Sequence, residues 1–420
     1  MHYVIVGAGP AGVIAAETLR KTDRDGIVTL LGGESRMPYS RMTIPYFLSD
    51  EIGEMATLLR KEEHYVGRGI DFRHSRVVRI KPEDRTLDLE DDTLLSYDRL
   101  LLATGSRPVT PPIIPGVDFP GVQHCWTLAD AHRLRTLAKP GCRVVLVGAG
   151  FIGCIIMGAL LGRGATVTLL EMENRMVPRM MDETGGELLR RWCTEKGVDV
   201  RTGTRITSIE QGNSSQDSSN EFVVYTETDN LAADLVVLAS GVRPNLDIIS
   251  GTGIAVEDGI LVDHYLRTNQ LAIYAAGDVA QGKDWSTGKQ TVHAIQPTAT
   301  EHGRVSAYNM AGIPTVYPGS FNMNVLDTMG LISTSMGIWN RDEGSEYAML
   351  LDSERYKYIQ LVFRDDVLIG SLGIGSLQFA GALRGLIQGK TRLGKWKRRL
   401  QYDPTRVMEA YVSSIRDFRT

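Results

Sequence analysis

The chain has 420 residues, of which 43% are hydrophobic, and a formal net charge of -4 at pH 7. This length exceeds what a single hydrophobic core usually organises, so two or three globular domains are expected. The mildly acidic balance excludes a general attraction to nucleic acid, and the most apolar stretch, residues 151–161, is too short for a membrane span.

A short strand followed by a glycine-rich turn opens the chain. Residues 3–6 are apolar and mostly β-branched, which is typical of a buried parallel strand. The strand leads into Gly7-Ala8-Gly9-Pro10-Ala11-Gly12 at the start of a helical stretch. Glycines at this spacing let the chain turn sharply and let backbone N–H groups approach a pyrophosphate at the helix N-terminus. Because the strand begins at the second or third residue, no space is left for a signal peptide, and a cytoplasmic location is expected.

An acidic residue is expected after the next strand, where it accepts hydrogen bonds from a ribose. Glu34 follows the apolar strand at residues 28–31 and meets this expectation, with Gly33 as the alternative for the ribose-facing position.

The same arrangement recurs in the middle of the chain. Residues 143–147 form a second buried strand, Gly148-Ala149-Gly150-Phe151-Ile152-Gly153 follows it, and Glu171 comes after the strand at residues 167–170. One such fingerprint is a weak signal, but two in the right context, each with its acidic residue, form a strong one. Two dinucleotide sites imply two nucleotides, one of which delivers electrons to the other.

Each half closes with a similar strand and small-residue turn. Residues 100–102 precede Ala103-Thr104-Gly105, and residues 235–238 precede Ala239-Ser240-Gly241. A further segment, residues 268–278, ends in Ala276-Gly277-Asp278 and completes the first half only after the second has finished. The sequence therefore predicts an α/β fold with two Rossmann-like dinucleotide-binding domains, the second inserted in the first.

After about residue 318 the pattern changes to antiparallel strands, at residues 345–351, 356–364 and 367–373. They predict a small α+β C-terminal domain, which closes with a basic helical piece from Lys390 to Arg399. Earlier in the chain, the polar tract at residues 211–220 indicates a hairpin tip. The predicted boundaries are residues 1–112 and 245–317 for the first domain, 113–244 for the second and 318–420 for the third.

Four cysteines stand at positions 125, 142, 154 and 193, with neither a C-x-x-C pair nor metal-ligand spacing. They are expected to be reduced, packed thiols without a redox role, and no metal site is predicted.

On these motifs the chain resembles the pyridine nucleotide-disulfide oxidoreductase superfamily, especially its rubredoxin and ferredoxin reductases and the flavin domains of nitrite reductases. The resemblance implies that the first fingerprint binds FAD and the inserted one a nicotinamide nucleotide. By the same resemblance Asp278 would accept hydrogen bonds from the ribityl chain, and Arg41 would lie in the loop over the FAD. The implied FAD contacts are Gly7, Gly9, Pro10, Ala11, Gly12, Glu34, Arg41, Ala103, Thr104, Gly105, Gly277 and Asp278. The implied contacts to the nicotinamide nucleotide are Gly148, Gly150, Phe151, Ile152, Gly153, Glu171 and Gly241.

Two departures from the family pattern bear on the reaction. Relatives that reduce coenzyme A disulfide, or oxygen to water, have a cysteine where this chain has Met42. A thioether forms neither a thiolate nor a disulfide, so a covalent sulfur relay is disfavoured. The family usually has a glutamate near the nicotinamide where this chain has Ile155, which weakens the expectation for the electron donor. Glu171 would repel a 2′-phosphate, and Arg175 stands four residues away, so NADH is favoured over NADPH.

The resemblance implies an FAD-dependent NADH:acceptor oxidoreductase. A hydride passes from the nicotinamide to flavin N5, and electrons then leave to a small redox protein such as ferredoxin or rubredoxin, without a catalytic acid or base. Lys390 to Arg399 is a candidate docking site for that partner, with a solvated helix face as the alternative.

Two other functions stay open, an NADH oxidase that reduces oxygen directly and a non-enzymatic NAD(H)-sensing interaction module. His293 and His302, predicted to flank the helix after the Ala-Gly-Asp motif, are candidates for flavin neighbours or, more commonly, for packing and capping. The natural acceptor, the direction of electron flow and a homodimer are left open.

Overall fold

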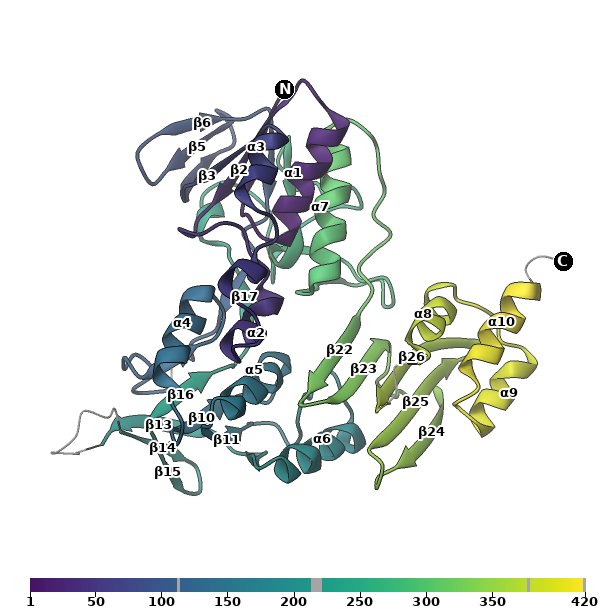
Figure 1. Ribbon diagram of the computed structural model, residues 1–420. Helices are drawn as coiled ribbons and strands as arrows, with labels where there is room; N and C mark the ends of the chain where they lie inside the picture. The colour runs from purple at the N-terminus through teal and green to yellow at the C-terminus, as the bar shows by residue number, and fades with distance from the viewer. Residues whose placement is uncertain (112–113, 213–220, 376–377, 418–420) are drawn as a thin grey trace. The chain divides into compact units, whose positions relative to one another are not determined.

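The computed structural model describes residues 1–111, 114–212, 221–375 and 378–417 (Figure 1). The chain forms two compact units, each built from separate stretches of sequence. Unit 1 comprises Met1–Phe47, Ile52–Pro108 and Val242–Phe321. Unit 2 comprises Leu48–Glu51, Val109–Gly241 and Asn322–Thr420.

A five-stranded parallel sheet forms the centre of unit 1, in the order β19-β7-β1-β2-β3. Its strands are β1 (His2–Val6), β2 (Ile27–Gly32), β3 (Ile70–His74), β7 (Arg99–Leu102) and β19 (Ile273–Ala275). Side chains alternate between the two faces of a strand, and here both faces are covered. Tyr3 and Ile5 lie in one hydrophobic core, whereas Val4 and Val6 lie in the other. This explains why β1 is apolar at its four buried positions, Tyr3 to Val6.

Two helices pack side by side within unit 1, α1 (Pro10–Thr22) and α7 (Gln296–Met310), drawn in purple and green in Figure 1. Their backbones approach closely because Gly303 has no side chain; a Cβ there would lie 2.2 Å from the carbonyl oxygen of Ala11. The remaining α-helices and strands are short, and they lie in this unit apart from Leu48 at the end of α2, which belongs to unit 2. They are α2 (Ile44–Leu48), α3 (Glu62–Gly67), β4 (Val77–Lys81), β5 (Thr86–Leu89), β6 (Leu94–Ser96), β8 (Ser106–Pro108), β17 (Val242–Pro244), β18 (Ile260–Leu261), β20 (Ala280–Lys283) and β21 (Gln290–Val292).

A second five-stranded parallel sheet lies in unit 2, in the order β12-β11-β10-β16-β9. Its strands are β9 (Val122–His124), β10 (Arg143–Val147), β11 (Thr166–Leu170), β12 (Asp199–Arg201) and β16 (Leu235–Leu238). Three helices accompany it, α4 (Leu128–Leu137), α5 (Phe151–Gly162) and α6 (Glu183–Glu195). An antiparallel sheet of β13 (Ile206–Gln211), β14 (Phe222–Thr226) and β15 (Asn230–Ala233) completes this part.

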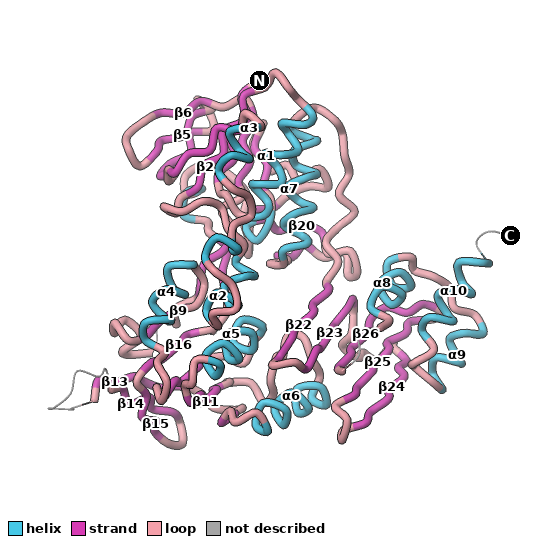
Figure 2. The backbone as a smooth tube through the Cα atoms, viewed as in Figure 1, coloured by secondary structure: helices cyan, strands magenta, loops and turns pink. Residues whose placement is uncertain are grey.

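The C-terminal part of unit 2 is an antiparallel sheet in the order β22-β23-β26-β25-β24, with three helices beside it (Figure 2). The strands are β22 (Met323–Thr328), β23 (Leu331–Gly337), β24 (Glu346–Asp352), β25 (Lys357–Arg364) and β26 (Val367–Ile374). The helices are α8 (Ala380–Gln388), α9 (Lys395–Tyr402) and α10 (Val407–Asp417). Helix α6 contacts this sheet, because the indole N–H of Trp192 donates to the carbonyl oxygen of Thr328 at 3.0 Å.

The predicted fold class, two Rossmann-like domains and a small α+β domain, is confirmed. The three predicted C-terminal strands are present as β24, β25 and β26, but β22 and β23 were not predicted. The paired strands β13 and β14 confirm the predicted hairpin, whereas most of its tip, residues 213–220, lies outside the described residues. The predicted domain boundaries stay a prediction.

Two smaller expectations were wrong. His302 lies inside α7 and does not flank it. The basic piece is not one helix, because Lys390 and Gly394 have positive φ angles of 45° and 53° and α9 begins only at Lys395. None of the described helices combines the length and the apolar character needed to cross a membrane.

Candidate dinucleotide-binding sites

The three glycines of the first fingerprint have three different surroundings. Gly7 has a φ angle of +111°, and a Cβ there would lie 2.1 Å from the carbonyl oxygen of Ala103. A Cβ on Gly12 would lie 1.9 Å from the carbonyl oxygen of Gly7. Around Gly9, by contrast, no described atom beyond its two chain neighbours lies within 4 Å of the added carbon. The outer glycines are therefore required by the turn itself, whereas the central one borders open space where a ligand can approach the backbone.

The second fingerprint repeats this pattern glycine by glycine. Gly148 has a φ angle of +103°, and its Cβ would lie 2.6 Å from the carbonyl oxygen of Ala239. A Cβ on Gly153 would lie 2.0 Å from the carbonyl oxygen of Gly148, and Gly150 borders open space. Both turns thus have the shape that receives a pyrophosphate.

The helices that follow the turns leave their N-terminal N–H groups available. Helix α1 starts with Gly9 as N-cap and Pro10 in its first turn, and α5 starts with Gly150 as N-cap. In these two described helices, neither cap makes a side-chain hydrogen bond and neither first turn contains an acidic residue. Unpaired N–H groups and the positive end of the helix dipole favour a bound anion. Ala11, Phe151 and Ile152 lie in these first turns, as predicted.

The two acidic residues, which occupy similar sequence positions, differ in their partners. Glu171 is buried, and its two carboxylate oxygens accept the backbone N–H of Ala149 at 2.7 Å and of Glu173 at 2.9 Å. Glu171 therefore holds the backbone of Ala149, inside the second fingerprint, in place. Glu34 accepts the hydroxyl of Tyr39 at 2.6 Å and the guanidinium of Arg41 at 2.9 Å. It therefore fixes the loop that was expected to lie over the FAD.

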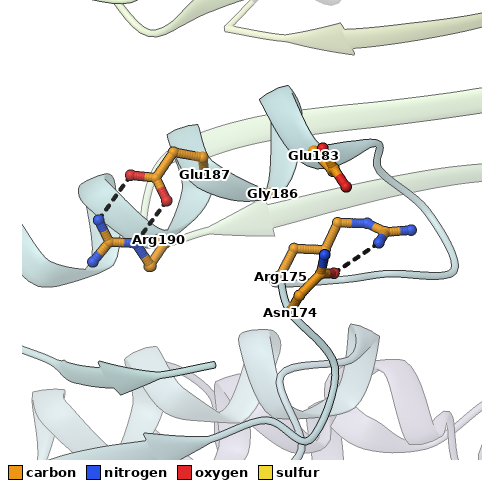
Figure 3. A pocket seen from close by; sticks show the side chains of 6 residues that line it. All are labelled: Asn174, Arg175, Glu183, Gly186, Glu187 and Arg190. Atoms are coloured by element: carbon orange, nitrogen blue, oxygen red, sulfur yellow. Dashed lines mark hydrogen bonds and ion pairs between the residues drawn. The ribbon is translucent and has the colours of Figure 1, made fainter. Parts of the chain in front are cut away.

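A polar pocket of about 280 Å³ lies beside the loop that follows Glu171 (Figure 3). Its lining residues are Asn174, Arg175, Glu183, Gly186, Glu187 and Arg190. The guanidinium of Arg175 donates to the carbonyl oxygens of Met181 at 3.0 Å and Pro178 at 3.2 Å, and to Asn174 at 3.0 Å. Arg190 pairs with Glu187 at 2.7 Å. The guanidinium groups of Arg175 and Arg190 therefore both have partners within the chain.

The turns after β7 and β19 meet in unit 1. The hydroxyl of Ser106 donates to the Asp278 carboxylate at 2.7 Å. Burial raises the pKa of Asp278, and the Ser106 hydrogen bond and the positive charge of Arg41 oppose this rise. The amide of Asn245 donates to the carbonyl oxygen of Thr104 at 2.8 Å. Unit 1 thus brings the predicted residues Arg41, Thr104 and Asp278 together with two residues that the sequence did not single out.

The corresponding turn in unit 2 contains Gly241. Like Gly105, it has a positive φ angle, and no described atom beyond its two chain neighbours lies within 4 Å of an added Cβ. The side of α5 at its start is apolar, since Phe151, Ile152 and Ile155 are all half-buried there. The first turn of α5 contains no acidic residue, and Ile155 follows it where the family usually has a glutamate.

The cysteines have no disulfide partners among the described residues. Cys125, Cys154 and Cys193 are buried, while Cys142 is half-buried. Burial raises the pKa of Cys125 and Cys193 to about 12 and that of Cys154 well above its usual value. Met42, by contrast, is 48% exposed.

Comparison with known proteins gives consistent matches. The sequence model of the family described as "Pyridine nucleotide-disulphide oxidoreductase" matches residues 1–301. The chain is 30% identical to the NADH-dependent phenylglyoxylate dehydrogenase subunit epsilon of Aromatoleum evansii, over 98% of this chain and 97% of the relative. It is 33% identical to rhodocoxin reductase of Rhodococcus erythropolis, over 76% of this chain and 74% of the relative. A solved structure, an NAD-dependent persulfide reductase from A. fulgidus, has a TM-score of 0.86 and 26% identity and covers 94% of this chain and 78% of that one.

Proposed function

The chain belongs to the pyridine nucleotide-disulphide oxidoreductase family, and we propose that it is an FAD-dependent enzyme that passes electrons between NADH and a small redox protein. The observation that supports this most is that the same glycine geometry occurs twice. In each turn the outer glycines pack against backbone and the central glycine borders open space, so each turn has room for one dinucleotide. The residues that the sequence predicts as contacts to FAD and to the nicotinamide nucleotide are the proposed binding residues.

A bound flavin supplies the redox chemistry, since it accepts a hydride and releases electrons singly. The chain contributes binding and orientation. Gly9 and Gly150 leave space for the two pyrophosphates, and the N-termini of α1 and α5 offer them N–H donors. Asp278, held by Ser106, is the proposed acceptor for the hydroxyls of the FAD ribityl chain.

NADH is the proposed nucleotide for unit 2. Glu171 is buried and negatively charged where a 2′-phosphate would lie, so a phosphate would meet like charge. Arg175 offers little compensation because its guanidinium already donates to Pro178, Met181 and Asn174. Steady-state kinetics with both nucleotides tests this, and a tenfold preference for NADPH would contradict it.

An external acceptor is proposed because the chain has no thiol at the position of Met42. The buried cysteines have raised pKa values, so they form thiolates poorly and do not replace the missing relay. A bound flavin would therefore supply electrons to another protein without a thiol of this chain as a relay. The names of the relatives point to such acceptors, since one is a rhodocoxin reductase and another is a rubredoxin-NAD(+) reductase of Pseudomonas putida.

The proposed docking surface is the basic segment from Lys390 to Arg399. Arg392, Lys395 and Arg398 are exposed there, and Tyr402 at the end of α9 is 94% exposed. Such a surface fits an acidic partner and raises its rate of encounter. Lys397 is excluded from this role because its ammonium group contacts Glu346 and the carbonyl oxygen of Asp365.

The partner is either a separate protein or a stably bound subunit. The full-length match to a protein named as a dehydrogenase subunit favours the second form, because this match includes the C-terminal domain. Size-exclusion chromatography of the native complex distinguishes the two forms.

The decisive experiment is an anaerobic stopped-flow measurement. NADH is expected to bleach the flavin, and later mixing with ferredoxin or rubredoxin is expected to restore its colour. Rapid aerobic consumption of NADH without a partner would favour an oxidase. Retained FAD that neither nicotinamide nucleotide reduces would favour a sensing module. A protein that stays colourless after incubation with FAD would refute the proposal.

A further inference from the structure

His302 lies in α7 and is only 2% exposed. Both ring nitrogens have partners in unit 1. The backbone N–H of Gly277 donates to Nδ1 at 3.3 Å, and Nε2 lies 3.3 Å from the hydroxyl oxygen of Ser320. Both distances are at the long end for hydrogen bonds.

These partners determine the tautomer of the ring. A backbone N–H can only donate, so Nδ1 has no proton and the ring proton lies on Nε2. Nε2 then donates to Ser320, whose hydroxyl oxygen also accepts the hydroxyl of Tyr317 at 3.1 Å. The ring of Tyr317 stands edge-on to the imidazole, with 4.7 Å between the centroids. Burial, together with the charge of His293, lowers the pKa of His302 to about 3, in agreement with a neutral ring.

The bond to Gly277 is significant because of the residue that follows. Gly277 has a φ angle of +75° and starts the short turn, Gly277–Val279, that contains Asp278. Ser106 holds the carboxylate of Asp278, and His302 holds the backbone just before it. A Cβ on Gly277 would lie 3.3 Å from the Cβ of Ala11, so the turn also touches the first fingerprint helix.

We propose that His302 is a positioning residue for the flavin. As a neutral ring protonated on Nε2, it orients the peptide of Gly277 and thereby presents Asp278 to the ribityl chain. This inference rests on the proposed function, in which unit 1 binds FAD. It assigns to α7 a part in cofactor binding beyond the packing of its helix against α1.

The surroundings favour this tautomer over a charged ring. His293, whose charge acts on His302, is paired with the carboxylate of Asp284 at 2.9 Å. The carboxylate of Asp284 also accepts hydrogen bonds from the backbone N–H and the hydroxyl of Thr287. The Asp284 carboxylate therefore already has partners other than His302. Ser320 and Tyr317 contribute hydroxyl groups alone. A proton on Nδ1 would face the N–H of Gly277, a donor against a donor.

The test compares substitutions at His302 by FAD dissociation constant, flavin midpoint potential and thermal stability of the flavin-free protein. His302→Leu leaves the N–H of Gly277 unpaired, and FAD is expected to bind about tenfold more weakly, with a shifted midpoint potential. His302→Gln can accept this N–H and donate to Ser320, so it is expected to restore most of the wild-type affinity. His264→Leu, at an exposed histidine of the same unit, is the control and is expected to match wild type.

Ser320→Ala is a second test that leaves the ring in place, and a threefold weaker FAD affinity is expected because Nε2 loses its acceptor. Equal FAD affinity in wild type, His302→Leu and Ser320→Ala, with only the thermal stability reduced, would overturn the proposal. So would a Gln variant no better than the Leu variant. If His302→Leu fails to fold, the Gln and Ser320→Ala variants decide in the same way. Failure of wild-type protein to bind FAD would instead refute the proposed function.

Discussion

The different partners of the two acidic residues lead to a quantitative prediction. Glutamine at position 171 replaces one carboxylate oxygen by an NH2 group, which then faces a backbone N–H of Ala149 or Glu173. One charge-assisted hydrogen bond is lost and one buried donor is left without an acceptor, so Glu171→Gln should lower the free energy of unfolding by about 2–3 kcal/mol. NADH should also bind at least tenfold more weakly, because the ribose loses a charged acceptor.

Glu34→Gln is the matched control. Its side chain is 41% exposed and that of its partner Arg41 is 37% exposed. Ion pairs of this kind contribute about 0–1 kcal/mol, so this substitution should cost at most about 1 kcal/mol and leave NADH affinity unchanged.

Urea-induced unfolding of the nucleotide-free proteins, followed by far-UV circular dichroism, measures the first quantity. Anaerobic titration with NADH, followed through the flavin absorbance, measures the second. If the two variants lose stability within about 0.5 kcal/mol of each other, burial and backbone partners do not distinguish the acidic residues, and the reasoning fails.

Three further predictions follow from single contacts. Gly9→Ala should fold but retain little FAD. Gly12→Ala should fail to fold, because its Cβ would lie 1.9 Å from the carbonyl oxygen of Gly7. Soluble yield measures folding of both variants, and the ratio of flavin to protein absorbance measures the retained FAD. His302 has a folded pKa of about 3, below that of the unfolded chain, so stability should fall as the pH drops from about 6.5 toward 3, by at most about 1.4 kcal/mol per pH unit. His302→Gln should flatten this dependence in urea titrations between pH 7 and 4.5. Lys395→Glu should slow reduction of an acidic protein acceptor several-fold at low salt and spare small dyes, whereas Lys397→Glu should lower the melting temperature because Lys397 pairs with Glu346.

The parts of the site that could be predicted are those with local causes. Gly7 and Gly12 are required by contacts within one strand-turn-helix unit, and Gly148 and Gly153 by the same contacts in the second unit. Spacing along the chain therefore reveals them. The predicted strands β24 to β26 were found for a similar reason, since a run of strand-forming residues is a local pattern.

The residues that were missed depend on distant partners. Ser106 bonds to Asp278 across 172 positions, and Asn245 bonds to Thr104 across 141. A lone serine or asparagine at the end of a strand has many common roles, so no sequence pattern marks these two. Their positions next to Gly105 and after Gly241 were the only available signal.

Glu34 and Glu171 illustrate the same limit in another way. The motif predicts where an acidic residue stands after the second strand, but not which groups surround it. In unit 2 the backbone N–H groups of Ala149, in the fingerprint, and of Glu173, in the loop that follows, donate to the two oxygens of Glu171. In unit 1 Tyr39 and Arg41, which come from a loop with no counterpart in the motif, occupy those of Glu34.

The unequal surroundings of the three glycines bear on how such a motif records ancestry. The first and third are fixed by clashes with the protein's own backbone, so a descendant that had lost its nucleotide would still need them. Of the three glycines in each fingerprint, only the central one, Gly9 or Gly150, tolerates substitution once no ligand contacts it. In a degenerate member of this lineage, replacement of the central glycine alone would therefore be the earliest trace of a vanished cofactor.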